Sequence, residues 1–379
     1  MNQADPLQRA WLEIKPAAIE HNARIIRNFI SENCLLMAVV KADGYGHGAH
    51  AVAIAALKGG ASCLGVATLY EGIELRKQGV GCPILILGNL INYQDLNTSF
   101  DWDLIPTISG LREAHFCEEI GIRLGRIFSI HIKIDTGMSR LGCDIKNTKN
   151  LMNQVNKLKH VKVIGIYSHL ACADDLQNEY SREFTQKQKS DFEEIRDLLP
   201  SKYKNVCLHL SNSAGTLNNK DLHYDMVRIG LALYGYQPNK GICTQLELKP
   251  AMTVKARITF IREVSSGVGV SYGHLYKTNR KTRLAVVGIG YADGVNRALS
   301  GKISALINGC KLPQVGAITM DQLILDATDI PDLHIGSVVT LLGADGANSI
   351  SVNDWTSKCD SIPWEILCGF KHRLPRVIV

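Results

Sequence analysis

Residues 35–48 have the sequence LLMAVVKADGYGHG, an apolar run that ends at Lys41 and leads into a glycine-rich turn. A short run that is apolar throughout is typical of a buried parallel strand, because helices cover both faces of such a sheet. In barrels of parallel strands the carboxyl ends face the active site, so Lys41 is expected there. If Lys41 is partly desolvated there, its pKa is lowered and its neutral amine can act as a nucleophile. The structural alternative is that the side chain of Lys41 extends into water, as most lysines at strand ends do.

The chain up to about residue 240 repeats this pattern of a short apolar run followed by a segment with helical spacing. The first helix is predicted to begin at Pro16, with Ile19, Ala23 and Ile26 on one face. Eight runs are predicted to be strands: 35–40, 63–67, 84–87, 104–106, 127–134, 163–168, 206–209 and 226–229. Eight such units are typical of an α/β protein with a (β/α)8 TIM barrel, and a doubly wound open sheet is the alternative.

The pattern changes after about residue 245, where helical spacing nearly disappears. Strand-like runs at 252–263, 283–289, 302–307, 323–327 and 337–341 are separated by Gly, Asn, Asp and Pro. Short strands separated by such turn residues predict a second, mainly antiparallel β domain. We therefore expect a barrel domain over residues 12–243 and a C-terminal β domain over 244–379, with residues 1–14 as candidates to pack against the latter.

Composition argues against several classes of protein. The net charge of +6 is spread along the chain, and the densest basic cluster, residues 277–283, is expected to be a solvated loop. Neither a nucleic-acid interface nor a membrane span is expected. The 11 cysteines form no C-x-x-C pair, so no metal site is predicted. Most cysteines are expected inside apolar runs (Cys34, Cys63, Cys207 and Cys310), and residues 1–11 are not expected to be a signal peptide. Both expectations favour the cytoplasm.

The sequence of residues 38–48, AVVKADGYGHG, resembles the pyridoxal-phosphate attachment motif of the alanine racemase family. The resemblance implies that Lys41 is the Schiff-base lysine and that Tyr45 reaches the cofactor phosphate. It therefore implies pyridoxal 5′-phosphate as the cofactor.

Residues 131–142, HIKIDTGMSRLG, are similar to the family segment whose arginine contacts the cofactor ring oxygen and the substrate carboxylate. The resemblance gives that role to Arg140. It also implies that Lys133, seven residues earlier, can be carbamylated and so present a negative charge to the arginine. A carboxylate-like partner fixes an otherwise mobile guanidinium through paired hydrogen bonds. Without the resemblance, Lys133 is simply a charge on a strand.

Segments that follow the last three predicted strands of the barrel also match the family. His169 corresponds to the histidine that bridges the cofactor-binding arginine and the catalytic tyrosine, and Arg228 to the arginine that faces the pyridine nitrogen. Loops after strands seven and eight often hold phosphate in barrels. By resemblance, the cofactor-binding residues of these loops are Asn212, Ser213, Gly230 and Leu231. A plain N-cap for the serine and a structural role for the histidine are the ordinary alternatives.

The β domain supplies the remaining matches. Residues 269–273, GVSYG, resemble the segment that contains the second base, here Tyr272. Residues 316–322, GAITMDQ, resemble the loop whose Met320 N–H binds the substrate carboxylate, with Asp321 beside it. Tyr291 and Arg297 match residues that line the substrate channel.

The resemblance runs from about Trp11 to Arg376 and implies an isomerase that interconverts L- and D-alanine and supplies D-alanine for peptidoglycan. Lys41 and Tyr272 would be two bases on opposite faces of the substrate, and the active form would be a homodimer with shared active sites. One departure is His372, which aligns with a position where some members have a phosphate-contacting tyrosine.

Three alternatives share part of this pattern. A serine or broad-specificity amino-acid racemase has the same fold. Basic amino-acid decarboxylases also join a pyridoxal barrel to a β domain, but they place a carboxylate, not an arginine such as Arg228, on the pyridine nitrogen. A non-catalytic pyridoxal-phosphate-binding protein resembles the barrel alone and lacks the β domain.

Overall fold

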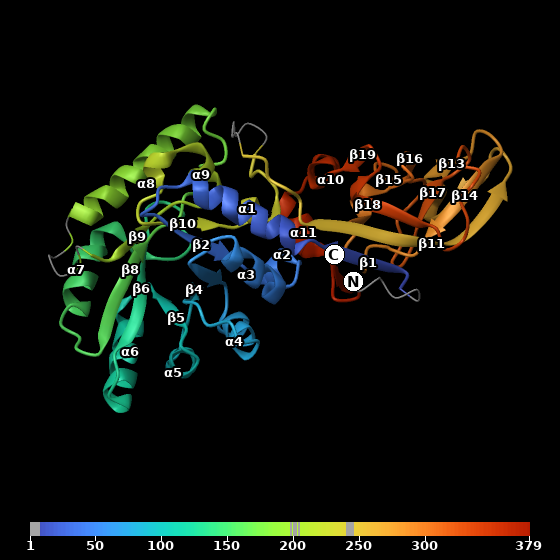
Figure 1. The fold of residues 1–379 in the computed structure, drawn as a ribbon. Coiled ribbons are helices and arrows are strands. Elements are labelled where there is room, and N and C mark those ends of the chain that lie inside the picture. Colours follow the sequence, from blue (N-terminus) through green and yellow to red (C-terminus); the bar gives the residue numbers. More distant parts are fainter. Residues whose placement is uncertain (1–7, 198, 200–202, 204, 240–245) are drawn as a thin grey trace. The chain divides into compact units, whose positions relative to one another are not determined.

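The computed structural model describes residues 8–197, 199, 203, 205–239 and 246–379, and the chain divides into two compact units (Figure 1). Residues 19–44 and 49–249 form the barrel unit. The described residues up to 18, residues 45–48 and residues 250–379 form the sheet unit. The predicted boundary at residues 243 and 244 lies outside the described residues.

The barrel unit contains eight parallel strands in the order β10-β2-β3-β4-β5-β6-β8-β9, which confirms the nearly closed (β/α)8 barrel. The doubly wound alternative is wrong, because the strand order follows the chain without reversing. Backbone hydrogen bonds from Asp225 to Leu208 and from Arg228 to Ser211, both 3.0 Å, bridge β9 and β10. The strands are β2 (Leu35–Val39), β3 (Cys63–Val66), β4 (Ile84–Asn89), β5 (Ile105–Ile108), β6 (Phe128–Asp135), β8 (Val161–Tyr167), β9 (Cys207–His209) and β10 (Met226–Ile229), and the short β7 (Cys143–Asp144) pairs with β6.

Helices alternate with these strands, as the apolar spacing predicts. The first, α1 (Pro16–Phe29), begins at the predicted proline, and Ile19, Ala23 and Ile26 are fully buried. The others are α3 (Ala49–Lys58), α4 (Leu69–Lys77), α5 (Tyr93–Asp101), α6 (Leu111–Leu124), α7 (Ile145–Val155), α8 (Glu179–Asp197) and α9 (Ser213–Asn218), with short 3₁₀ turns η2 (Lys220–Leu222) and η3 (Leu231–Tyr234). None of the described helices is long and apolar enough to cross a bilayer.

The sheet unit is organised around the long strand β11 (Met252–Val264), which pairs antiparallel with β1 (Ala10–Ile14), β14 (Thr282–Val287) and β18 (Val338–Asp345). Strand β20 (Arg376–Ile378) lies parallel to β1, so the strand-like residues near the N-terminus belong to this sheet. The remaining elements are β12 (Gly269–Val270), β13 (Tyr276–Lys277), β15 (Ser304–Ile307), β16 (Cys310–Pro313), β17 (Leu323–Asp326) and β19 (Asn348–Ile350), with the 3₁₀ turns η4 (Tyr272–His274) and η5 (Arg297–Leu299).

Two features of the sheet unit differ from the sequence-based expectation. It contains two helices that the spacing did not predict, α10 (Val352–Cys359) and α11 (Pro363–Gly369). Their signals are local: Ser351 and Asp354 form a capping box, and Pro363 occupies the first turn of α11. Cys310 was expected in an apolar interior but is exposed, because it begins the edge strand β16.

Candidate active site

Lys41 lies two residues after the end of β2 and begins α2 (Lys41–Tyr45), whose backbone is left-handed at residues 42–44. The φ angle is +52° at Ala42, +53° at Asp43 and +60° at Gly44. In this conformation a Cβ lies too close to the following carbonyl oxygen, which costs about 1–2 kcal/mol for each non-glycine residue. Such strain persists only where the surrounding structure holds it, and it clusters at functional sites.

Two carboxylates hold this strained turn. Glu71, in the first turn of α4, accepts the N–H of Ala42 at 2.7 Å, and Asp43 accepts the N–H of Ala49 at 2.9 Å. The second oxygen of Glu71 accepts the N–H of Ala67, also at 2.7 Å, just after β3. The backbone that bears the predicted Schiff-base lysine is therefore tied to the neighbouring barrel strand.

Arg228 is the centre of a buried polar network in the barrel unit, and only 3% of its surface is exposed. Its Nη1 lies 2.9 Å from Nδ1 of His209, and its Nη2 lies 3.0 Å from Nδ1 of His169. The same two nitrogens donate to the carbonyl oxygens of His209, Ser168 and Leu210 at 2.7–3.1 Å. Among the described residues, the Nε–H has no hydrogen-bond partner, so it is the donor available to a ligand.

The guanidinium of Arg228 determines which ring nitrogen of the neighbouring histidines carries the proton. An arginine side chain has only donors, so the Nδ1 atoms of His169 and His209 must both accept, and both rings carry their proton on Nε2. The Nε2–H of His209 then donates to Nδ1 of His131 at 2.9 Å. Burial lowers the pKa of His131 to about 3 and holds the pKa values of the other two rings well below the ordinary value, with the Arg228 charge acting in the same direction. All three histidines are therefore neutral.

Tyr167 joins this network to Lys133. Its ring stacks on His209 with centroids 4.6 Å apart, and it lies 5.1 Å from the guanidinium carbon of Arg228 and 5.4 Å from Nζ of Lys133. Its hydroxyl is 2.8 Å from Oγ1 of Thr107. Because aromatic faces attract cations, the ring can stabilise two buried positive charges at once.

Lys133 is buried among other cations, with 5% of its surface exposed. Burial lowers the pKa of its amine to about 8, and the charges of Arg228, Arg140 and Lys41 lower it as well. Arg140 lies in the loop after β6, which Asp135 organises by accepting the N–H of Gly137 at 2.9 Å. The structure thus brings Lys133 near Arg140, and a protonated amine repels that guanidinium.

The two predicted phosphate loops meet at Ser213. Its Oγ accepts the N–H of Gly230 at 2.9 Å and that of Ala232 at 3.4 Å. Asn212 caps α9: its side chain accepts the N–H of Gly215 and donates to Leu170, so its polar atoms are already engaged. Leu231 is buried next to Gly230.

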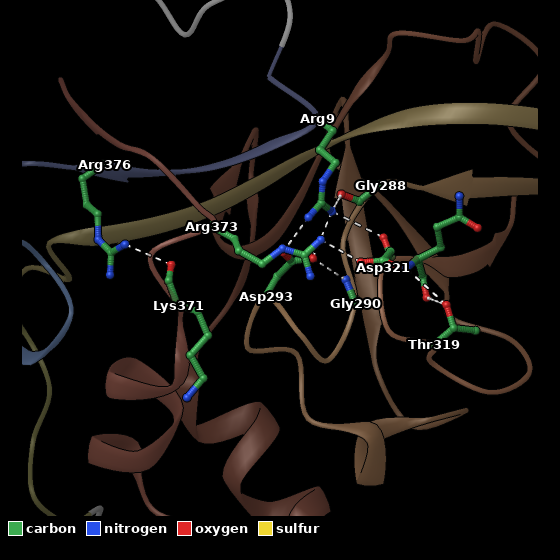
Figure 2. A network of polar contacts seen from close by, with 10 residues as sticks. Arg9, Gly288, Gly290, Asp293, Thr319, Asp321, Lys371, Arg373 and Arg376 are labelled. Atoms are coloured by element: carbon green, nitrogen blue, oxygen red, sulfur yellow. Dashed lines mark hydrogen bonds and ion pairs between the residues drawn. The ribbon is translucent and has the colours of Figure 1, made fainter.

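The remaining predicted residues belong to the sheet unit. Tyr45 is buried, and burial raises the pKa of its phenol. In contrast, Tyr272, Met320 and Tyr291 are exposed, at 74%, 53% and 40% of their surfaces. The backbone N–H of Met320 donates to no partner among the described residues. Asp321 accepts a hydrogen bond from Arg373 at 2.7 Å (Figure 2).

Sequence reasoning did not find His209, His131, Tyr167 or Glu71. Each lies on a strand or in the first turn of a helix, where a polar residue among apolar neighbours is the available signal. That signal shows only that a polar group is buried in the barrel. Which partner it contacts depends on strands that are far apart in the sequence.

We expect His209→Phe to lower the free energy of unfolding by about 2–4 kcal/mol, because it leaves a buried guanidinium N–H and His131 without their partner. His209→Asn, which keeps an acceptor, should lose about half as much. Urea denaturation at fixed protein concentration measures both. His115→Phe, on the exposed face of α6, is the control. Equal stability of His209→Phe and the control would contradict the role of His209.

Comparison with known proteins identifies the family. Residues 14–238 match the model of the alanine racemase N-terminal domain, and residues 251–378 match that of the alanine racemase C-terminal domain. The chain belongs to the alanine racemase family. It is 56% identical over 379 residues to an alanine racemase of Prochlorococcus marinus, covering 100% of this chain and 98% of the relative.

Alanine racemases of known structure share the whole architecture. The enzyme of Clostridium difficile 630 is similar with a TM-score of 0.90 at 35% identity, covering 98% of this chain and 96% of that one. The alanine racemase of Bartonella henselae, solved with covalently bound pyridoxal phosphate, has a TM-score of 0.87 at 30% identity, covering 98% of this chain and 100% of that one. The likeness to alanine racemases therefore includes both the barrel and the β domain.

Proposed function

We propose that this protein interconverts L- and D-alanine with pyridoxal 5′-phosphate bound at Lys41. We also propose that it acts in the cytoplasm and that its D-alanine is used for peptidoglycan. The main support is the match to alanine racemases over the full chain, at 56% identity to one of them. A non-catalytic pyridoxal-phosphate-binding protein is disfavoured, because the match includes the C-terminal domain.

The residues of the barrel unit fit this cofactor. The Nε–H of Arg228 is a donor without a partner among the described residues, and it suits a pyridine nitrogen. Ser213 and the adjoining backbone of Gly230 and Leu231 suit a phosphate. When bound, the cofactor withdraws the electrons left on Cα after its hydrogen is removed. Lys41 is an amine on a turn held by Glu71 and Asp43, as a covalent attachment point requires.

Racemisation needs a proton acceptor on each face of Cα. We assign Lys41 to the face from which D-alanine loses its proton and Tyr272 to the face from which L-alanine does. A free phenol has a pKa near 10, so a tyrosine base needs support at neutral pH. The neutral His169 offers it: its Nδ1 accepts from Arg228, so its Nε2–H is directed elsewhere and can donate to a tyrosinate oxygen.

Arg228 also favours racemisation over other reactions of amino acids. Burial lowers its pKa to about 10, so the side chain stays positively charged at neutral pH. A charged guanidinium cannot readily give its proton to a pyridine nitrogen, so that nitrogen stays unprotonated and withdraws electrons less strongly. This favours prompt return of the proton and argues against the decarboxylase alternative. Release of carbon dioxide from lysine or arginine would revive that alternative.

The substrate carboxylate is assigned to Arg140 and to the backbone N–H of Met320, with Tyr291 lining its approach. Lys133 supports Arg140 if its amine is carbamylated, because the new negative charge replaces repulsion with attraction. The lowered pKa of Lys133, about 8, leaves part of the amine neutral near pH 7.5, and the neutral amine is the form that reacts with carbon dioxide. Carbon-13 NMR in labelled bicarbonate detects such a carbamate, and Lys133→Ala should remove its signal.

We propose a homodimer in which Tyr272 and Met320 complete the partner's active site. The high exposure of Tyr272, at 74% of its surface, suits a residue that functions against a second chain. A mixture of inactive Lys41→Ala and Tyr272→Ala chains should then regain activity, to about a quarter of the wild-type value per site if the chains mix at random. Each variant alone is the control. Mixtures that stay inactive although mass spectrometry finds hybrid dimers would show that each site uses one chain only.

A chiral assay of L-alanine with added pyridoxal phosphate tests the proposed function. We expect equal amounts of the two enantiomers at equilibrium. The same assay with serine, lysine and arginine separates a strict alanine racemase from the serine or broad-specificity alternatives. The comparison is needed because a pocket that accepts alanine discriminates against the extra hydroxyl of serine by only about 1–3 kcal/mol. Faster turnover of serine than of alanine would favour the serine racemase.

A further inference from the structure

A buried carboxylate, Asp293, is held by two arginines in the sheet unit (Figure 2). Its side chain is fully buried, and it accepts from Nη2 and Nη1 of Arg9 at 2.6 and 3.0 Å. Nε of Arg373 lies 3.5 Å away, and the N–H of Gly290 donates to it at 2.9 Å. The carboxylate therefore fixes the turn of residues 290–294 from within.

This turn is bound directly to the loop that contains Met320. The N–H of Tyr291 donates to the carbonyl of Thr319 at 2.9 Å, and the N–H of Ala292 to that of Met320 at 3.0 Å. The contact leaves no space: a Cβ on Gly290 would lie 2.3 Å from the Thr319 oxygen and 2.5 Å from the Met320 oxygen. A shift of the turn is therefore transmitted to the Met320 backbone.

The arginines hold the other side of the same loop. Nη2 of Arg373 donates to the carboxylate of Asp321 at 2.7 Å, and Nη1 of Arg9 lies 3.4 Å from the carbonyl oxygen of Asp321. The loop is thus fixed before and after Met320, whose own N–H is left without a partner among the described residues. In Figure 2 these contacts converge from the N-terminal segment, the 290–294 turn and the C-terminal segment.

Stability alone does not require this arrangement. Burying a carboxylate is costly, and well-packed apolar residues of similar volume often serve stability as well or better. What a bidentate arginine–carboxylate pair adds is direction, because its two parallel hydrogen bonds fix the angle between the partners. The network is suited to holding a backbone group in one position.

We propose that Asp293 is a positioning residue for substrate binding: through the 290–294 turn, with Arg9 and Arg373, it sets the position of the Met320 N–H. The inference rests on the proposed function, in which that N–H receives the substrate carboxylate. A carboxylate contact is present both before and during the reaction, so its loss weakens binding more than it slows the chemical step.

The test is Asp293→Asn in the full-length protein loaded with pyridoxal phosphate. The amide keeps the shape and one acceptor oxygen but loses the charge. We expect KM for L-alanine to rise about tenfold with kcat changed by less than about threefold. The inhibition constant of propionate, a carboxylate without an amine, should rise by the same factor. The visible absorbance of the bound cofactor should be unchanged.

Asp329→Asn is the matched control, since it removes an exposed ion pair with Arg280 in the same unit. If Asp293→Asn does not fold, Arg373→Gln removes the ion pairs of Arg373 with Asp321 and Asp293 and leaves the pair between Arg9 and Asp293 in place. This variant should raise KM and the propionate constant about threefold, and Arg373→Lys should restore part of the loss. Unchanged constants in a folded, fully loaded Asp293→Asn or Arg373→Gln protein would overturn the inference. Wild-type protein that does not racemise alanine would instead overturn the proposed function.

Discussion

Replacing Lys41 by alanine is expected to lower the rate of alanine racemisation by at least about 10⁴-fold, because the proposed lysine is both the attachment point of the cofactor and one of two proton acceptors. The variant should also lose exchange of the α-hydrogen of D-alanine with deuterated water, since no other group is assigned to that face. Chiral chromatography and proton NMR measure the two effects.

The control is Lys58→Ala, which removes an exposed amine at the end of α3 in the same unit. It should behave as the wild-type protein does. Borohydride reduction followed by peptide mapping gives an independent readout, with the cofactor fixed to Lys41 in the wild type and to no residue in Lys41→Ala. Racemisation by Lys41→Ala within tenfold of the wild type would exclude the lysine as a base.

Tyr272→Phe is expected to slow racemisation by about 10²–10⁴-fold while leaving one partial reaction intact. Lys41 can still remove the proton of D-alanine and return a deuteron from the solvent to the same face. The variant should therefore exchange the α-hydrogen of D-alanine without inverting it, and it should hardly exchange that of L-alanine. This asymmetry between enantiomers is specific to a site with two different bases.

Tyr70→Phe is the matched control for this variant, because Tyr70 is exposed to a similar extent, 77% against 74% for Tyr272. It should leave racemisation and exchange unchanged. If Tyr272→Phe lost exchange of both enantiomers equally while retaining bound cofactor, the phenol would have a role in binding or folding instead. Exchange of both enantiomers at wild-type rates would show that another group removes the proton of L-alanine.

Much of the fold was determined by local patterns in the sequence. The apolar run 35–40 and the seven runs like it were predicted to be strands because they are mostly apolar and too short for a buried helix, even where they include His131, Lys133 or Arg228, and all eight occur in the barrel. After residue 245, strand-like runs separated by Gly, Asn, Asp and Pro predicted the antiparallel sheet in the same way. The helices α10 and α11 were not predicted from the sequence, because segments of eight and seven residues have too few turns for a clear helical periodicity.

The order of motifs along the chain also located most of the candidate site. A lysine after an apolar strand and a histidine or serine after later strands are local features that a single sequence displays. The resemblance to one family then gave each of them a role.

Only the tertiary structure decided how these groups act on one another. Three features depend on residues up to 284 positions apart: the Nε–H of Arg228 has no partner among the residues that the structure describes, His131, His209 and His169 are all neutral, and Asp293 is tied to the Met320 loop. No local propensity encodes such distances, because hydrogen bonding, burial and charge act through space and not along the chain.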